Sequence, residues 1–287
     1  MANLLSLKRR IRAAANVSKT TRAMQMIAVS KLKKAQDATV AGRPYVEKLS
    51  AISKNLFGKL ENEYVHAYMK KPKGMNKTLV LVFSPDKGLC GGLNSNLIRE
   101  LINFDSQNSD NIYLTVGKKI ETTVVNLQKE IVASFKFGTT LPSFDMVLPI
   151  TKIIDEYFLG KKIGSVKIIS TSFLSVFSQR PKITNILPLE FPKEETAFAA
   201  FTLFEPDPQE LLPILLRHFL EMTIYQHLLE SFASEQGART VAMQNATDNA
   251  LEIAQEFLLE YNKGRQEKIT NEILDIGGAG SAAYAYE

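Results

Sequence analysis

Two long runs almost free of helix-breaking residues lie at opposite ends of this 287-residue sequence, and they limit its possible folds more than any other feature. The first extends from residue 2 to about residue 60, with almost no breaker except Gly42 and Pro44, and the second extends from Pro208 to about Ile276. At 1.5 Å per residue, such helices would be roughly 80 and 100 Å long. A compact domain has no room for core helices of this length, so the sequence predicts two extended rods.

The first rod, residues 1–60, carries apolar and small residues in steps of three and four. They form one narrow seam: Leu4, Leu7, Ile11, Ala14, Ser18, Thr21, Ala28, Leu32 and Ala35. This spacing is typical of a coiled coil, and the small residues would let a partner helix approach closely. Pro44 removes one backbone hydrogen bond, so we expect the helix to bend or break there.

The middle of the chain, residues 77–204, changes to short β-rich runs that alternate with helical ones. The pattern predicts strands at 78–83, 112–116, 131–137 and 166–170, an additional edge strand at 181–188, and helices at 95–103, 118–127 and 144–158. Such alternation is typical of a mainly parallel sheet covered by helices. The expected fold class is therefore α/β, with two long terminal helices flanking a Rossmann-like domain.

The second rod, residues 208–287 with its terminal tip, should begin with Asp207 as the N-cap and Pro208 as the first helical residue. We expect the glycine-rich run at 277–280 to end the helix. If the two rods meet the middle domain at one point, they pair antiparallel, and the longer second rod extends beyond the first. Its last apolar residues, Ile269, Ile273, Leu274 and Ile276, would then lack cover within this chain. An exposed apolar tip of this kind indicates a surrounding partner protein.

Charge is distributed unevenly along the chain. Residues 1–60 contain thirteen Lys and Arg against two acidic residues, a net +11 within a total of +5, which leaves the remainder at −6. This asymmetry favours a polyanionic neighbour, whether nucleic acid, anionic lipid or an acidic protein surface, although a solvated helix face gives the same composition. Cys90 is the only cysteine, which excludes an internal disulfide and a cysteine-built metal site. No apolar run is long enough to span a bilayer, so we expect no membrane insertion.

One loop has a context that suits phosphate binding. Residues 86–94, here called the glycine turn, follow a predicted strand and precede a predicted helix, and they contain Gly88, Gly91 and Gly92. The turn lacks the Gly-Lys-Ser/Thr ending of a P-loop and the spacing of a dinucleotide fingerprint, so a structural turn is the favoured interpretation. The three histidines have no metal-ligand spacing and no neighbouring nucleophile. The sequence therefore predicts no catalytic residues, no metal and no cofactor.

Three stretches resemble the gamma-subunit family of bacterial-type F-type ATP synthases. The first is the basic, methionine-containing segment 19–32 followed by 42–45, and the second is the glycine turn. The third and most specific is 233–243 with 245–249, followed by 261–266 and 269–270. The sequence departs from the common family pattern at Gly237 and Gly264, where alanine is usual, and at Gln25, where glutamate is usual.

The resemblance implies a non-catalytic rotor shaft that couples proton flow through a membrane ring to ATP synthesis or hydrolysis. Its partners would be the alpha and beta subunits of a catalytic hexamer, the epsilon subunit and the membrane c-ring, with one copy per complex. The complex would lie at the cytoplasmic face of a bacterial plasma membrane. The resemblance implies beta-subunit contacts at Met24, Arg239, Arg265, Gln266 and Thr270, and a ring contact at Glu205.

Two alternatives from other classes remain at this stage. A coiled-coil protein could bind nucleic acid through the basic first rod, although that rod lacks interleaved aromatic residues. A nucleotide-binding α/β enzyme would depend on the glycine turn alone. The resemblance favours the rotor shaft over both, with no nucleic acid among the expected partners.

Overall fold

The computed structural model describes residues 4–59, 66–72, 74–108, 110–190, 205 and 207–283, without the side chains of 57–59, 208 and 275–283. It divides the chain into two compact units. One comprises residues 1–27 and 242–287, here called the helical unit, and the other comprises residues 28–241, here called the globular unit. Because α1 and α5 each contribute to both, the units are described separately.

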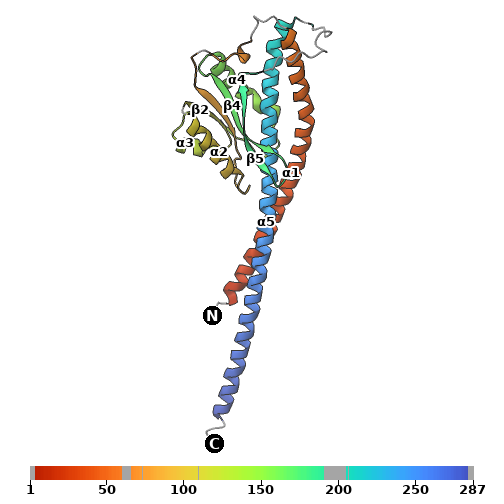
Figure 1. The fold of residues 1–287 in the computed structure, drawn as a ribbon. Helices are drawn as coiled ribbons and strands as arrows, with labels where there is room; N and C mark the ends of the chain where they lie inside the picture. The colour runs from red at the N-terminus through yellow and green to blue at the C-terminus, as the bar shows by residue number, and fades with distance from the viewer. Residues whose placement is uncertain are drawn as a thin grey trace. The chain divides into compact units, whose positions relative to one another are not determined.

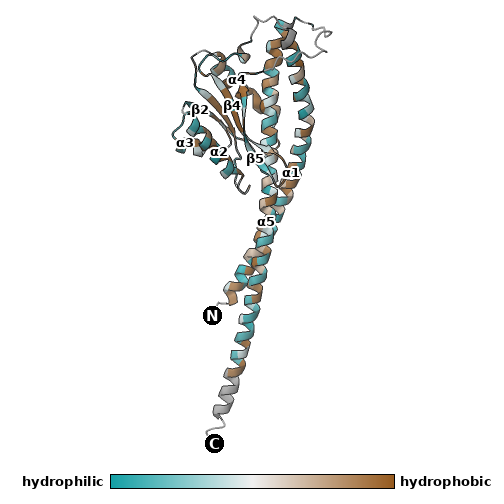
Figure 2. Ribbon diagram, viewed as in Figure 1, coloured by the Kyte–Doolittle hydropathy of each residue, from teal (hydrophilic) through white to brown (hydrophobic). Residues whose placement is uncertain are grey.

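Two helices account for both rods. α1 extends over Leu4–Lys59 and α5 over Pro208–Ala283. α1 continues through Pro44, so the helix is not interrupted there. α5 continues through the glycines at 277–280, so the expected stop there was wrong. Each glycine lowers helix propensity by about 1 kcal/mol but blocks no backbone hydrogen bond. Figure 2 shows hydrophobic and hydrophilic residues alternating along both helices, as amphipathic packing requires.

The N-terminus of α5 is capped as its sequence predicts. Asp207 precedes the helix, and its Oδ1 accepts a hydrogen bond of 2.8 Å from the backbone N–H of Gln209. Pro208 occupies the first helical position, where a missing N–H costs nothing. Asp207 and Pro208 therefore define where α5 begins.

The globular unit contains a five-stranded sheet in the order β3-β2-β1-β4-β5 (Figure 1). Its strands are β1 (Thr78–Phe83), β2 (Asn111–Val116), β3 (Ile131–Phe135), β4 (Ser165–Phe173) and β5 (Gln179–Leu187). The first four are parallel, whereas β5 pairs antiparallel with β4 through a hairpin. The remaining elements are α2 (Leu93–Gln107), α3 (Lys118–Asn126), α4 (Val147–Leu159) and two short 3-10 helices, η1 (Ala67–Met69) and η2 (Phe144–Met146).

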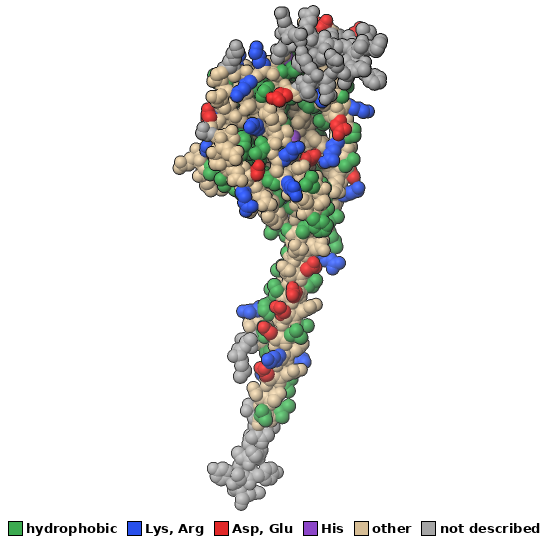
Figure 3. All heavy atoms as spheres, in the orientation of Figure 1, with side chains coloured by type: hydrophobic (Ala, Val, Ile, Leu, Met, Phe, Trp, Pro, Cys, Tyr) green, Lys and Arg blue, Asp and Glu red, His purple; other side chains and the backbone are tan. Residues whose placement is uncertain are grey.

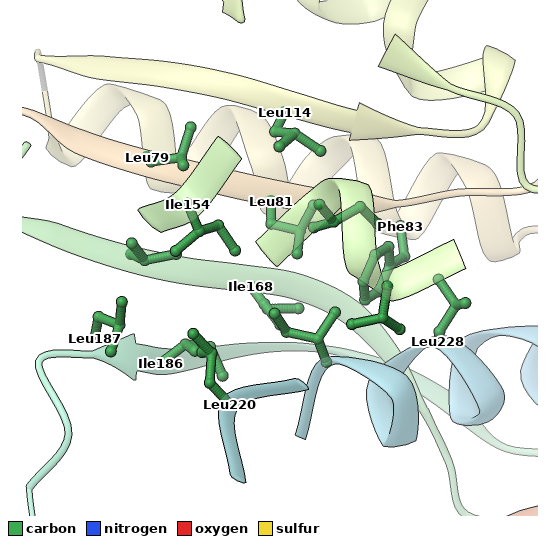
Figure 4. Close-up of a cluster of buried hydrophobic side chains, with 14 of the residues drawn as sticks. Leu79, Leu81, Phe83, Leu114, Ile154, Ile168, Ile186, Leu187, Leu220 and Leu228 are labelled. Carbon is green, nitrogen blue, oxygen red and sulfur yellow. The ribbon is translucent and has the colours of Figure 1, made fainter. Parts of the chain in front are cut away.

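Helices cover both faces of this sheet, which confirms the α/β fold class. Val80 and Val82 of β1 pack with α2 and α3, whereas Leu79, Leu81 and Phe83 point to the opposite face, because side chains alternate along a strand. On that face they meet α4, α5 and α1 in one continuous core, part of which is drawn in Figure 4. Each fully buried aliphatic side chain contributes about 1.5–3 kcal/mol. This core fixes α5 to the sheet.

The two long helices pair antiparallel within each unit. In the globular unit, Gln226 of α5 donates to the carbonyl of Thr39 in α1. In the helical unit, the Thr21 and Thr247 hydroxyls lie 2.7 Å apart, and Arg10 stacks over the ring of Phe257 at 5.7 Å. The predicted seam residues of α1 are all buried or partly buried, so the coiled-coil prediction is confirmed.

Candidate functional surfaces

The glycine turn follows β1 at the carboxyl edge of the parallel sheet, where α/β proteins of this kind bind ligands. The Asp86 carboxylate lies at the centre of this edge. Its Oδ1 accepts backbone N–H bonds from Lys118 at 3.0 Å and Phe137 at 3.3 Å, and its Oδ2 accepts one from Gly138 at 2.8 Å. One side chain therefore joins the end of β1, the start of α3 and the segment after β3.

The N-terminus of α3 is saturated by the protein itself. Besides Lys118, the N–H of Lys119 donates to the Pro85 carbonyl at 3.3 Å, and the N–H of Ile120 donates to Ser84 Oγ at 3.1 Å. Gly117, before the helix, has φ of 108°, and a Cβ there would lie 1.9 Å from the Ser84 carbonyl oxygen. Anion sites at helix N-termini need free N–H groups. The first three N–H groups of α3 already donate hydrogen bonds within the protein, which disfavours a phosphate site there.

The crevice where the strand order reverses lies between β1 and β4, and α5 covers both sides of it. Ser234 of α5 donates to the Thr171 carbonyl of β4 at 3.1 Å, and Arg239 of α5 donates to the Gly88 carbonyl after β1 at 3.3 Å. Related folds use this crevice for a dinucleotide. Here α5 bonds to the ends of both strands, which disfavours a dinucleotide at this position.

Arg239, one of the predicted beta-subunit contacts, points inward in this structure. Its side chain is 13% exposed and forms an ion pair with Glu235 at 2.6 Å, one helical turn earlier. Glu235 is buried, and burial raises the pKa of its carboxyl despite the opposing effect of Arg239. The Glu235 Oε2 atom is buried without a hydrogen-bond partner. Arg239 therefore connects α5 to the glycine turn through a buried, incompletely satisfied ion pair.

Arg265, Gln266 and Thr270 lie together on α5 in the helical unit, and all three are exposed. Leu4, the first described residue of α1, lies beside Gly264, where a Cβ would be 3.4 Å from Leu4 Cδ2. Among the described residues that follow, Ile269, Ile273 and Leu274 are 47%, 63% and 65% exposed. The predicted apolar end of α5 is thus exposed at these positions, while the side chain of Ile276 lies outside the described residues.

The basic segment of α1 in the helical unit presents its charges to solvent. Its Lys and Arg residues are all exposed: Lys8, Arg9, Arg10, Arg12, Lys19 and Arg22. Met24 follows them and is partly buried. Figure 3 shows hydrophobic side chains interspersed with charged ones along this unit. Met24 is some twenty residues along the pair from Arg265, so these two predicted contacts do not form one site.

Glu205, the predicted ring contact, is exposed and lies two residues before the N-cap of α5. Its neighbours at 191–204 and 206 lie outside the described residues. Within the part of the chain that the structure describes, no helix is long and apolar enough to cross a membrane. No group of His, Cys, Asp or Glu in that part is arranged to hold a metal ion.

Comparison with known proteins identifies the family. A sequence model described as ATP synthase matches residues 3–283. A protein named ATP synthase gamma chain from Dehalococcoides mccartyi is 41% identical over 290 residues, which covers 99% of this chain and 100% of the relative. The chain belongs to the ATP synthase gamma chain family. A second gamma chain, from Methylacidiphilum infernorum, is 37% identical and covers 97% of this chain and 98% of the relative.

Solved structures agree with this assignment to the gamma chain family. A chain of the Tetrahymena thermophila mitochondrial ATP synthase central stalk and c-ring has a TM-score of 0.60 and 25% identity, covering 79% of this chain and 99% of that one. A chain of the Euglena gracilis mitochondrial ATP synthase has a TM-score of 0.72 at 17% identity, covering 98% and 95%. The second supports the fold of paired helices around a sheet domain.

Two features of this gamma chain were not predicted from the sequence. The Glu235–Arg239 pair has the i, i+4 spacing of helical ion pairs, but the sequence did not show that it is buried. His227 of α5 bonds through Nδ1 to Ser170 Oγ of β4 at 3.0 Å. Burial, with a smaller effect of Lys182, lowers the pKa of His227 to about 4. Neither partner could be paired without the tertiary structure.

Proposed function

We propose that this gamma chain is the non-catalytic rotating shaft of an ATP synthase. In this role it transmits proton-driven rotation of a membrane c-ring to the catalytic beta subunits of an alpha–beta hexamer, with an epsilon subunit at its globular end. One copy serves each complex. The complex lies at the cytoplasmic face of a bacterial plasma membrane, since the similar gamma chains named above come from bacteria.

The observation that carries the proposal is the end of α5. Beyond Gly264 the described part of α5 carries three apolar residues, Ile269, Ile273 and Leu274, which are 47%, 63% and 65% exposed. Burial of Ile269, Ile273 and Leu274 in an encircling partner would remove this exposed surface from water. A sleeve formed by the hexamer provides such cover. Arg265, Gln266 and Thr270 on the same stretch are then placed to meet polar groups of the beta subunits.

A non-catalytic shaft can act only through contacts whose free energy differs between the conformations of the surrounding subunits. Because it is asymmetric, each orientation favours a different conformation of each surrounding subunit, and rotation changes their nucleotide affinities in sequence. One exposed ion pair supplies about 0.2–1 kcal/mol, whereas one proton crossing 100 mV supplies about 2.3 kcal/mol. The free energy released by several protons is therefore larger than any single contact can supply. Torque therefore rests on the shape and rigidity of the helix pair, and the basic face of α1 with Met24 tunes the coupling.

Reconstitution tests this proposal. The purified chain is mixed with separately purified alpha and beta subunits, and ATP hydrolysis is measured with and without it. We expect a complex with one copy of this chain and strongly stimulated turnover, whereas the chain alone has no hydrolytic activity. A folded chain that fails to associate, or hydrolysis by the isolated chain, would contradict the proposal.

A further inference from the structure

The buried contact between α5 and the glycine turn is built from very few groups. Arg239 bonds to Glu235 Oε1 at 2.6 Å and to the Gly88 carbonyl at 3.3 Å, so one guanidinium bridges the helix and the turn. The side chains are 13% and 5% exposed. A guanidinium paired with a buried carboxylate cannot swing out without leaving that charge unpaired, which is strongly unfavourable. The direction of Arg239 therefore depends on Glu235.

The pair is not arranged for maximal stability. When an arginine donates to both oxygens of a carboxylate, it forms two parallel hydrogen bonds, and this geometry is stronger than a single hydrogen bond. Here Glu235 Oε2 is buried and has no donor. Buried ion pairs frequently add little net stability compared with apolar residues, and an unsatisfied atom reduces their contribution further. A contact that is costly and incomplete, yet sets the direction of one side chain, is better explained by positioning than by stabilisation.

Other charges surround this pair. Asp86 raises and Lys31 lowers the pKa of Glu235, so both act on it electrostatically. Lys31 Nζ donates to the Thr139 carbonyl, beside the Gly138 N–H that Asp86 holds. Lys31 of α1 and Asp86 of the glycine turn thus both bond to the segment after β3, and both act electrostatically on Glu235.

We propose that Glu235 is a positioning residue, which directs Arg239 onto the Gly88 carbonyl and thereby holds the glycine turn against α5. Its importance for coupling rests on the proposed shaft function, in which torque depends on the shape and rigidity of the helix pair. The clamp itself is a property of the isolated chain and can be tested there.

Cys90 provides the probe. It is the only cysteine, lies inside the glycine turn and is 1% exposed, packed with Leu93 and Ala238. Burial also raises the pKa of its thiol, which slows its reaction further. The rate at which an aromatic disulfide reagent modifies Cys90 in the folded, full-length chain reports opening of the turn. Dividing by the rate in denaturant at the same pH removes the intrinsic reactivity.

We expect Glu235→Gln to raise this normalised rate at least tenfold. The matched control is Glu221→Gln, which removes another i, i+4 pair of α5, Arg217 Nε to Glu221 Oε1 at 3.2 Å, away from the turn. The control should stay within twofold of wild type. Equal rates for Glu235→Gln and the control would overturn the clamp. A similar rise in both would also overturn it, because general loosening of α5 would then be the cause.

A double-variant comparison tests whether Glu235 acts through Arg239. Arg239→Lys keeps the positive charge but removes the planar fork, and should also accelerate modification. Combining it with Glu235→Gln should add nothing further, because the positioned group is already gone. Additive effects would show that Glu235 holds the turn by another route and would overturn the positioning role.

The assembled complex supplies the functional readout. We expect Glu235→Gln to lower proton pumping per ATP hydrolysed while subunit assembly is retained, and Glu221→Gln to leave this ratio unchanged. Faster Cys90 modification with unchanged pumping would overturn the role in coupling. Failure of the wild-type chain to assemble would instead count against the proposed function, and the thiol result on the isolated chain would stand.

Discussion

Substitution of Gly237 and Gly264 of α5 should have different outcomes, although both change glycine to alanine in one helix. At Gly264 a new Cβ would lie 3.4 Å from Leu4 Cδ2, which is ordinary van der Waals contact. At Gly237 it would lie 3.0 Å from Phe173 Cε2 and 3.6 Å from Gln179 Nε2. The first site has room for the methyl group, and the second requires the aromatic ring to move.

The magnitudes follow from these distances. Alanine is about 1 kcal/mol more favourable than glycine in a helix interior, so Gly264→Ala should stabilise the helical unit by up to that amount. At Gly237 the same gain opposes an overpacking cost of about 1–3 kcal/mol. We therefore expect Gly237→Ala to leave the globular unit unchanged or less stable by up to about 2 kcal/mol.

Native-state hydrogen exchange measures each effect locally, which matters because the glycines lie in different units. Amides around position 264 should exchange up to about fivefold more slowly in Gly264→Ala, the factor for about 1 kcal/mol. Amides around position 237 should exchange at the same rate or faster in Gly237→Ala. If Gly237→Ala slowed exchange around position 237 more than Gly264→Ala slowed it around position 264, the packing argument would be refuted. We also expect Gly264→Ala to raise the torsional stiffness of the shaft in single-molecule rotation.

Three further predictions concern single side chains. Because the pKa of His227 is lowered to about 4 from 6.5, its stabilising contribution is complete above pH 6.5 and lost as the pH falls toward 4. This amounts to about 3 kcal/mol, and urea titrations of His227→Gln should lack that pH-dependent loss. Asp86→Ala should destabilise the globular unit by about 2 kcal/mol in the same assay, because three backbone donors lose a charged acceptor. Ile273→Asp should change the stability of the isolated chain by less than about 0.5 kcal/mol, since that side chain is 63% exposed, yet strongly reduce stimulation of hydrolysis in the complex.

Local patterns in the sequence predicted most of the fold. The β1 prediction at 78–83 matches the observed strand, and the proline-flanked run at 181–188 was correctly placed as an added strand. Asp207 as N-cap followed from side-chain chemistry alone. The glycine run at 277–280 failed as a stop signal, because propensity weighs against a helix without forbidding it. Pro44 did not end α1 either, although it removes one backbone hydrogen bond.

The candidate contacts were harder to predict because they depend on tertiary neighbours. The sequence showed that Arg239 lies on a long helix, but its direction is set by Glu235 and by a carbonyl 151 positions away in the chain. The sequence allowed Asp86 to be part of a ligand-binding loop, whereas in the structure its carboxylate accepts hydrogen bonds from three backbone N–H groups. Exposure of Ile273 followed from the unequal lengths of the two rods, which is a geometric property the sequence does contain.

The most direct test of the account is to watch this chain turn. In a complex of this chain with immobilised alpha and beta subunits, a bead attached to the globular unit is followed under the microscope after ATP is added. We expect rotation in one direction, in steps that follow successive hydrolysis events. Sustained ATP hydrolysis by the assembled complex with a stationary or randomly moving bead would contradict it.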